Sequence, residues 1–269
     1  MATKLYDSII FGPIQSRRLG VSLGVNLLAL NKKICSFDCV YCECGFTQND
    51  VHGKFAEKNV VIENLESVLK EMLQNEKHLD VITFAGNGEP TLHPNFDEII
   101  DATILLRNHY FPKAKISVLS NATTLNKESV IKALSKVDNN ILKLDSGLVE
   151  TIKLIDQPTS SNFSIDTVIN GMLRFNGDFI MQTMFLKGDF NGMRIDNTTE
   201  NEVNAWLEIV KITHPKQIMI YSIDRDTPVK TLEITTNFKN GSYNGEGENL
   251  IAEFGSSSSS YYDKYMDIP

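Results

Sequence analysis

The stretch CSFDCVYC, residues 35–42, places Cys35, Cys39 and Cys42 on one short segment in the order C-x3-C-x2-C. Three thiolates at this spacing can reach three corners of a cubane iron–sulfur cluster, which leaves the fourth iron without a protein ligand. An iron with an open position can bind a further molecule. The spacing therefore predicts a [4Fe-4S] cluster with one open corner.

Other interpretations of the cysteines stay open. All four cysteines lie between positions 35 and 44, whereas a structural zinc site usually draws on two separated pairs and a disulfide scaffold links distant segments. A zinc knot and a chance grouping of buried thiols are the alternatives to the cluster. Cys44 could be a fourth ligand, a hydrogen-atom donor or a plain loop residue, and the last is favoured.

The rest of the chain alternates short apolar segments with longer helical patterns. Strands are expected at 22–29, 81–85, 115–119, 140–144, 178–186 and 216–222, and helices at roughly 60–76, 95–109, 126–136, 147–155, 164–175 and 199–212. This alternation predicts parallel strands joined by crossover helices. Six units are fewer than a closed barrel needs, so the predicted fold is α/β, a partial (β/α)6 TIM-like barrel with outer helices.

The predicted barrel occupies residues 1–233, and 234–269 are expected to be a loosely ordered C-terminal extension. Asn and Gly dominate its first part, and the serines at 256–260 are typical of a flexible linker. A covering arm is an alternative, and Tyr261, Tyr262 and Tyr265 make self-modification conceivable. The segment GDFNG at 188–192 is predicted to be a loop.

Composition and charge limit the kinds of partner that the protein can bind. The formal net charge of -8 disfavours broad attraction to nucleic acid or anionic lipid. No run approaches the roughly 20 apolar residues of a membrane span, and the first residues do not resemble a signal peptide, so a cytoplasmic location is predicted. Arg17, Arg18, Lys32 and Lys33 are interpreted as solvated loop residues, with a local basic patch as the alternative.

CSFDCVYC resembles the cluster motif of the radical S-adenosylmethionine (SAM) superfamily, in which an aromatic residue, here Tyr41, commonly precedes the third cysteine. The segments 12–28, 83–94 and 223–233 resemble the branch that contains the wyosine-base synthases and uncharacterised bacterial relatives. The resemblance covers roughly residues 5–233. It implies a [4Fe-4S] cluster and SAM as cofactors, an electron donor such as flavodoxin or ferredoxin, and an enzyme of oxidoreductase or lyase type.

The turn GNGEP follows an apolar strand, where Gly86 and Gly88 let a ligand approach the backbone. Glu89 and the carbonyl groups of this turn can accept hydrogen bonds from the amino group of SAM. In similar enzymes a Gly-Gly-Glu-type turn does this, and here Asn87 separates the glycines. An ordinary strand-to-helix turn is the alternative.

Polar residues at the ends of the next strands are further candidates. Ser120 and Asn121 are predicted to contact the SAM carboxylate or ribose, although turn capping would also explain them. Lys143 and Asp145 lie on one strand face and could hold SAM or orient substrate, and Asp145 could equally cap the next helix.

Gln182 and Tyr221, together with Asp224, are candidate contacts on the last two strands, to cofactor or substrate. No G-x-S-x-G motif or P-loop is present, which argues against hydrolase or nucleotide-triphosphatase chemistry.

The implied chemistry splits SAM to a 5'-deoxyadenosyl radical that takes hydrogen from a substrate. A wyosine-type enzyme would act on transfer RNA, but the chain is acidic, and residues 1–34 lack the additional cysteines that such enzymes carry. A peptide or small-molecule substrate is therefore favoured over RNA. A module that binds an iron–sulfur cluster or zinc without cleaving SAM is the alternative from a different class.

Overall fold

The computed structural model describes residues 4–16, 19–48, 52–223, 227–233 and 242–244. The chain divides into two compact units. The N-unit contains Lys4–Ser36 and Thr47–Ile141, and the C-unit contains Phe37–Phe46 and the chain from Leu142 onward. The cysteine motif is thus shared, because the chain leaves the N-unit directly after Cys35 and Ser36.

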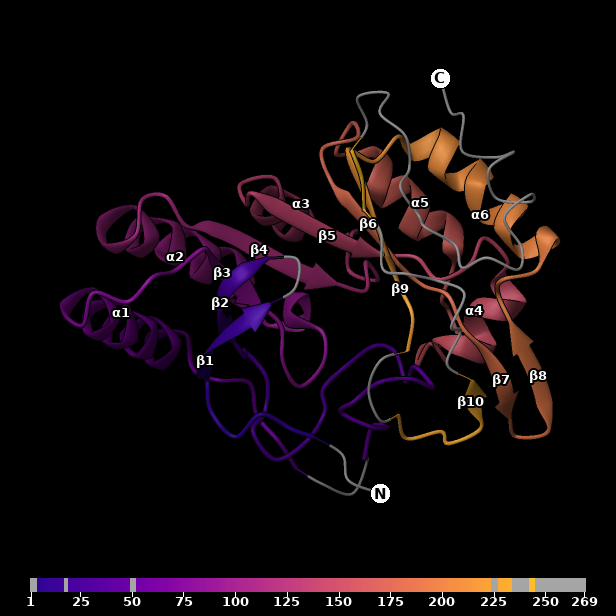
Figure 1. Cartoon of the computed structure of the whole chain (residues 1–269), viewed down its shortest axis with the longest axis horizontal. Coiled ribbons are helices and arrows are strands. Elements are labelled where there is room, and N and C mark those ends of the chain that lie inside the picture. The colour runs from indigo at the N-terminus through magenta and orange to yellow at the C-terminus, as the bar shows by residue number, and fades with distance from the viewer. Residues whose placement is uncertain (1–3, 17–18, 49–51, 224–226, 234–241, 245–269) are drawn as a thin grey trace. The chain divides into compact units, whose positions relative to one another are not determined.

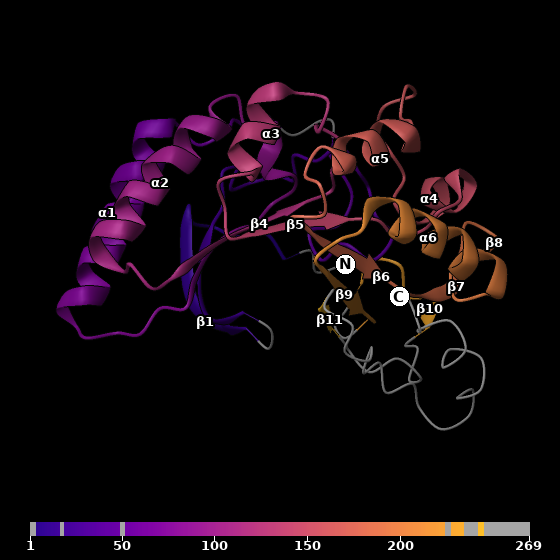
Figure 2. The same cartoon turned by 90° about the horizontal axis from the view of Figure 1, so that it is seen from above.

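The N-unit is built on parallel strands with helices between them (Figure 1). Strand β2 pairs with β3 and β3 with β4, both parallel, while β1 pairs antiparallel with β2. Helices α1 and α2 lie side by side (Figure 2). The elements are β1 (Ile10–Ser16), β2 (Gly20–Val25), α1 (Lys58–Gln74), β3 (Val81–Phe84), the 3-10 helix η1 (Pro90–Leu92), α2 (Phe96–Tyr110), β4 (Lys115–Ser120) and α3 (Glu128–Leu134).

The chain passes from the N-unit to the C-unit within β5 (Asn139–Lys143). In the C-unit, β6 and β9 pair in parallel, β11 joins β9 antiparallel, and β10, β7 and β8 form a small separate sheet. The elements are α4 (Val149–Ile155), α5 (Ile165–Leu173), β6 (Ile180–Met184), β7 (Lys187–Phe190), β8 (Met193–Asp196), α6 (Glu200–Thr213), β9 (Gln217–Tyr221), β10 (Leu232–Glu233) and β11 (Ser242–Asn244).

Burial explains why these segments form the core. All four residues of β3 are buried, as expected for a parallel strand with a near-continuous apolar sequence. In the C-unit, Trp206 of α6 packs on β6 and donates its indole N–H to Thr183 Oγ1 at 3.0 Å. The predicted α/β fold class is confirmed, since each predicted strand and helix overlaps an observed one.

The prediction of a loop at 188–192 was wrong, because this segment forms the β7–β8 hairpin (Figure 1). Asn191 and Gly192 at its tip have φ of 50° and 77°, which suits a tight hairpin turn. The flanking strands are short and polar, so they carry no apolar alternation that would mark them in the sequence. Strands β1, β10 and β11 were also not predicted.

The interpretation of Lys33 as a solvated residue was wrong as well, because its exposed fraction is 3%. It directly precedes Ile34, whose backbone pairs with the turn after β3 and holds this segment against the N-unit. No described helix is long and apolar enough to cross a membrane.

Parts of the predicted extension cannot be compared. Of residues 234–269 the structure describes Ser242–Asn244, so loose order of this segment stays a prediction. Several residues singled out in the sequence lie outside the described residues, namely Arg17, Arg18, Asp224, the serines at 256–260, Tyr261, Tyr262 and Tyr265.

Candidate active site

In the N-unit, the segment that enters Cys35 pairs with the GNGEP turn at the carboxyl end of β3. The N–H of Ile34 donates to Asn87 O at 2.8 Å, and the N–H of Glu89 donates to Ile34 O at 3.0 Å. Gly88 has φ of +135°, and a Cβ there would lie 1.9 Å from the Ile34 carbonyl oxygen. Only glycine allows this approach, so the turn fixes the position of the first cysteine.

The side chain of Asn87 holds the same turn in place. Its Oδ1 accepts the N–H of Tyr6, and its Nδ2 donates to the carbonyls of Tyr6 and Ala29, all at 2.8 Å. Gly86 leaves room for the neighbouring Asn26 side chain. These bonds give Asn87 a positioning role, and a direct contact of Gly86 or Asn87 with SAM stays a prediction.

Glu89 connects the loops that follow β3 and β4. Its carboxylate accepts the N–H of Thr91 at 3.0 Å and the N–H of Asn121 at 2.6 Å, and its exposed fraction is 2%. Burial raises the pKa of Glu89, although the hydrogen bonds from Asn121 and Thr91 oppose this. Much of the acceptor capacity predicted for the SAM amino group is therefore used inside the protein.

Ser120 and Asn121 form the turn that the sequence offered as an alternative. Ser120 Oγ accepts the N–H of Ala122, and Asn121 Oδ1 accepts the N–H of Thr123, both at 3.1 Å. The Asn121 amide also donates to Ser36 Oγ at 2.8 Å and to Cys35 Sγ at 3.6 Å. Asn121 thus brings the loop after β4 to the first cysteine.

In the C-unit, two successive turns carry the other motif cysteines. The N–H of Cys42 donates to Cys39 O at 3.0 Å, and the N–H of Gly45 donates to Cys42 O at 2.9 Å. The N–H of Val40 donates to the Ile155 carbonyl at the end of α4 at 2.9 Å. None of the four described cysteines forms a disulfide.

Lys143, at the end of β5, contacts Cys39 and two carboxylates. Its Nζ lies 2.9 Å from Cys39 Sγ and 3.2 Å from Asp145 Oδ2, and it also contacts Asp156 Oδ1. The side chains of Lys143, Asp145 and Asp156 are exposed to 12%, 1% and 3%. We call Cys39, Lys143, Asp145 and Asp156 the Lys143 cluster.

Two aromatic rings line this cluster. Lys143 Nζ lies 4.9 Å from the ring centre of Phe37 and 5.1 Å from that of Tyr41, and the Tyr41 hydroxyl donates to Asp145. Burial, together with the charge of Asp145, raises the pKa of Tyr41 well above its ordinary value. Tyr41 is therefore a neutral hydroxyl donor near pH 7.

Burial also shapes the charges of the cluster. It lowers the pKa of Lys143, but Asp145 and Asp156 reverse this and hold it well above its ordinary value. Burial raises the pKa of Asp156 to about 7, against the attraction of Lys143. Lys143 is therefore an ammonium group, and such a group beside Cys39 favours the thiolate that ligates iron.

The prediction that Asp145 could cap the next helix was wrong. Leu148 is the N-cap of α4, and Asp145 Oδ1 accepts the N–H of Met184 at 2.8 Å. Sequence reasoning missed Asp156, the C-cap of α4. Its signal was weak, because an acidic residue between an apolar helix and Gln157-Pro158 is ordinary at a helix end.

Gln182 and Tyr221 lie on the sheet face opposite α6. In β6, Thr183 bonds to Trp206 of α6, so the adjacent Gln182 points to the other face. Tyr221 of β9 pairs with Met184 of β6, two positions beyond Gln182 and therefore on the same face. Whether either side chain contacts cofactor or substrate stays a prediction.

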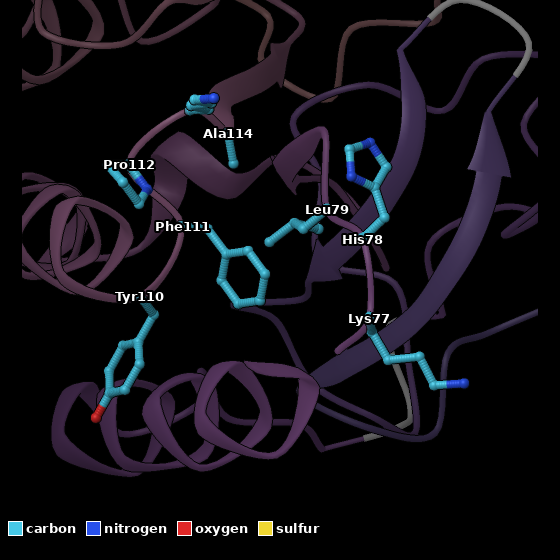
Figure 3. Close-up of a pocket in the computed structure, with 8 residues that line it drawn as sticks. Lys77, His78, Leu79, Tyr110, Phe111, Pro112 and Ala114 are labelled. Atoms are coloured by element: carbon cyan, nitrogen blue, oxygen red, sulfur yellow. The ribbon is translucent and has the colours of Figure 1, made fainter. Parts of the chain in front are cut away.

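A hollow of about 330 Å³ in the N-unit lies at the end of the sheet opposite the GNGEP turn (Figure 3). The residues that line it directly precede β3 or end α2 and lead into β4, so it lies at the amino ends of these strands. The GNGEP turn and Ser120-Asn121 follow the carboxyl ends, where parallel α/β folds build their sites. The lining residues are Lys77, His78, Leu79, Tyr110, Phe111, Pro112, Lys113 and Ala114.

Comparison with known proteins defines the class. The Radical SAM superfamily profile matches residues 33–173, more than half of the chain, and the chain belongs to this superfamily. Its cofactors are accordingly a [4Fe-4S] cluster and SAM, and within the C-unit the ammonium beside Cys39 suits a thiolate ligand. Membership supports an enzyme with SAM-dependent radical chemistry over a zinc-binding module.

The similar proteins include the UPF0026 protein slr1464 of Synechocystis, 30% identical over 82% of this chain and 77% of that protein. A UPF0026 protein of Helicobacter pylori is 28% identical over 84% and 70% of the two chains. The GTPase Obg of Brachyspira hyodysenteriae is 30% identical over 84% of this chain, which spans only 31% of that protein.

Solved structures share the fold at low sequence identity. SuiB of Streptococcus suis bound to S-adenosylmethionine has a TM-score of 0.55 at 15% identity, over 77% of this chain and 42% of SuiB. The enzyme anSMEcpe with bound AdoMet has 0.54 at 20%, over 78% and 55%. A TYW1 with a lysine-pyruvate adduct has 0.53 at 14%, over 78% and 67%. The predicted partial-barrel fold is confirmed by these neighbours.

Proposed function

We propose that this chain holds its [4Fe-4S] cluster on Cys35, Cys39 and Cys42, and that it cleaves SAM reductively to take hydrogen from a peptide substrate. When bound, the cluster supplies the electron that splits SAM into methionine and a 5'-deoxyadenosyl radical. The observation that carries the proposal is the contact between the partly buried Lys143 ammonium and Cys39 Sγ at 2.9 Å, which suits a thiolate ligand.

The remaining predicted residues have distinct proposed tasks. The backbone of the GNGEP turn would offer acceptors to the cationic amino group of SAM, and Gly86 and Gly88 would let that turn pack closely against Asn26 and Ile34. Glu89, Asn87 and Asn121 would keep that turn and Cys35 in position. The other proposed contacts to SAM or substrate are made by Tyr41, Ser120, Lys143, Asp145, Gln182 and Tyr221.

A peptide is the favoured substrate, with a small molecule as second choice. SuiB bound to its precursor peptide SuiA has a TM-score of 0.52 with this chain, which is a precedent for peptide binding on this fold. The net charge of -8 opposes an RNA substrate, because phosphates would be repelled. An external donor such as flavodoxin or ferredoxin would supply the electron.

The wyosine-type alternative has less support. The TYW1 neighbour, which holds a lysine-pyruvate adduct, is 14% identical to this chain, and identity this low shows a shared fold and no shared substrate. The net charge of -8 points the same way, because this alternative requires binding of transfer RNA.

Anaerobic reconstitution with iron and sulfide tests the proposal. With dithionite and SAM, the wild-type protein should release 5'-deoxyadenosine and carry about four iron atoms per chain. Cys39→Ala should lose both properties, whereas the control Cys44→Ala should keep them. Zinc in place of iron, or turnover retained by Cys39→Ala, would contradict the proposal.

Isotope transfer identifies the substrate class. Cells grown in deuterated medium would supply separate fractions of peptides, small metabolites and RNA. The radical takes hydrogen from its substrate, so deuterium should appear in 5'-deoxyadenosine with the peptide fraction. Transfer from the RNA fraction alone would revive the wyosine-type alternative, and transfer from the metabolite fraction alone would move the substrate to a small molecule.

A further inference from the structure

The Lys143 cluster places a positive charge against one thiol of the cysteine motif. Lys143 Nζ lies 2.9 Å from Cys39 Sγ, within reach of a charge-assisted hydrogen bond. The side chain of Lys143 is 12% exposed, so little water screens its charge. Other groups of the protein, not solvent, therefore set the electrostatic field at this sulfur.

The two carboxylates of the cluster are not equivalent. Asp145 accepts hydrogen bonds from the Tyr41 hydroxyl and the N–H of Met184 in addition to its ion pair with Lys143. Asp156 pairs with Lys143 from the end of α4. Both carboxylates therefore offset the charge of the ammonium, and they do so from different elements of the C-unit.

Reduction of a [4Fe-4S] cluster by one electron adds negative charge to the irons and their thiolate sulfurs. Hydrogen bonds to these sulfurs and nearby net charge set the reduction potential. A cationic donor stabilises the reduced form more than the oxidised form, so it raises the potential. A carboxylate beside the donor has the opposite effect.

We propose that Lys143 sets the reduction potential of the cluster through its hydrogen bond to Cys39, and that Asp156 lowers this potential by offsetting the ammonium. Lys143 and Asp156 are then positioning residues for electron transfer. The inference rests on the proposed function, because it requires the cluster to be bound at Cys39. One electron enters from an external reductant, and no covalent bond of either side chain changes.

Redox titration followed by electron paramagnetic resonance tests the proposal on reconstituted protein at about pH 8. In Lys143→Met the ratio of reduced to oxidised cluster at a fixed applied potential should fall roughly tenfold, a shift of about 59 mV for one electron. Asp156→Asn, which keeps shape and volume, should raise this ratio. Lys143→Arg keeps the positive charge, so its reduction potential should lie much closer to that of the wild type than the potential of Lys143→Met does.

A matched control comes from α4. Lys153 is 56% exposed and pairs with Glu150, so Lys153→Met removes a lysine near the same helix end without touching Cys39. Its potential should equal that of the wild type.

The outcomes separate the two proposals. Absence of a [4Fe-4S] signal in the wild-type protein would remove the proposed function. A loaded Asp156→Asn protein whose potential equals or falls below that of the wild type would overturn the inference alone. Asp156→Asn therefore tests the inference even if Lys143→Met does not fold. Lys143→Met leaves two buried carboxylates without their partner.

Discussion

The two halves of the cysteine motif lie in different electrostatic environments. In the N-unit, Cys35 follows a backbone pairing between Ile34 and Gly88 and accepts a neutral amide donor from Asn121. In the C-unit, Cys39 contacts the ammonium of Lys143. Backbone hydrogen bonds position both halves, but only the C-unit half has a positive charge beside one of its sulfurs. Variants of the N-unit should change stability and loading, and variants of the C-unit should change electrostatics.

The largest effect is expected at Gly88. A Cβ at this position would meet the Ile34 carbonyl at 1.9 Å, and the backbone has φ of +135°. Overpacking and backbone strain together should cost roughly 5 kcal/mol in Gly88→Ala, measured by urea unfolding, and the cluster should not load. Gly192→Ala is the control, since φ is +77° but nothing lies within 4 Å, so its cost should be about 1 kcal/mol. Equal losses in both variants would refute the steric explanation.

The next effect concerns pH. The pKa of Asp156 is raised to about 7 by burial, so this group favours the folded state when neutral and loses that contribution as pH rises through 7. Asp156 should therefore lower the free energy of unfolding of the apo protein by about 3 kcal/mol between about pH 5 and about pH 8. The Asp156→Asn side chain stays neutral, so this variant should lack that decrease in the free energy of unfolding.

Glu150 provides the comparison for this pH effect. Its side chain is 83% exposed on the same helix, so Glu150→Gln should leave the pH profile as in the wild type. If Asp156→Asn keeps the full wild-type fall, the buried carboxylate is not its source.

A smaller effect is expected at Asn121. Asn121→Ala removes the hydrogen bonds to Ser36, Thr123 and Cys35 and leaves these partly buried polar groups without this partner. We expect a loss of roughly 2 kcal/mol in urea unfolding and weaker iron retention. Asn162→Ala, on an exposed turn, should change neither quantity. Unchanged iron retention in Asn121→Ala would remove its positioning role.

The difference between the halves also explains what the sequence could predict. The spacing of Cys35, Cys39 and Cys42 and the glycines of GNGEP are local patterns, so the motif and the close approach at Gly88 were accessible. The alternation of apolar strands and helices predicted the fold for the same reason. The β7–β8 hairpin was missed because polar strands leave no periodic signal.

The Lys143 cluster depends on contacts between residues far apart in the chain. Lys143 and Asp145 were candidates from their shared strand face, but the partner Cys39 lies 104 residues away from Lys143 and could not be inferred. Asp156 looked like an ordinary helix end. Its importance arises only from burial against the lysine, which single-sequence patterns do not report.

The most direct test of the central claim is electron–nuclear double resonance of the dithionite-reduced protein with SAM labelled with nitrogen-15 in its amino group. If the open iron corner binds SAM, the labelled nitrogen should show a hyperfine coupling to the cluster spin. A loaded and reduced cluster whose spectrum shows no such coupling and does not change when SAM is added would contradict the account.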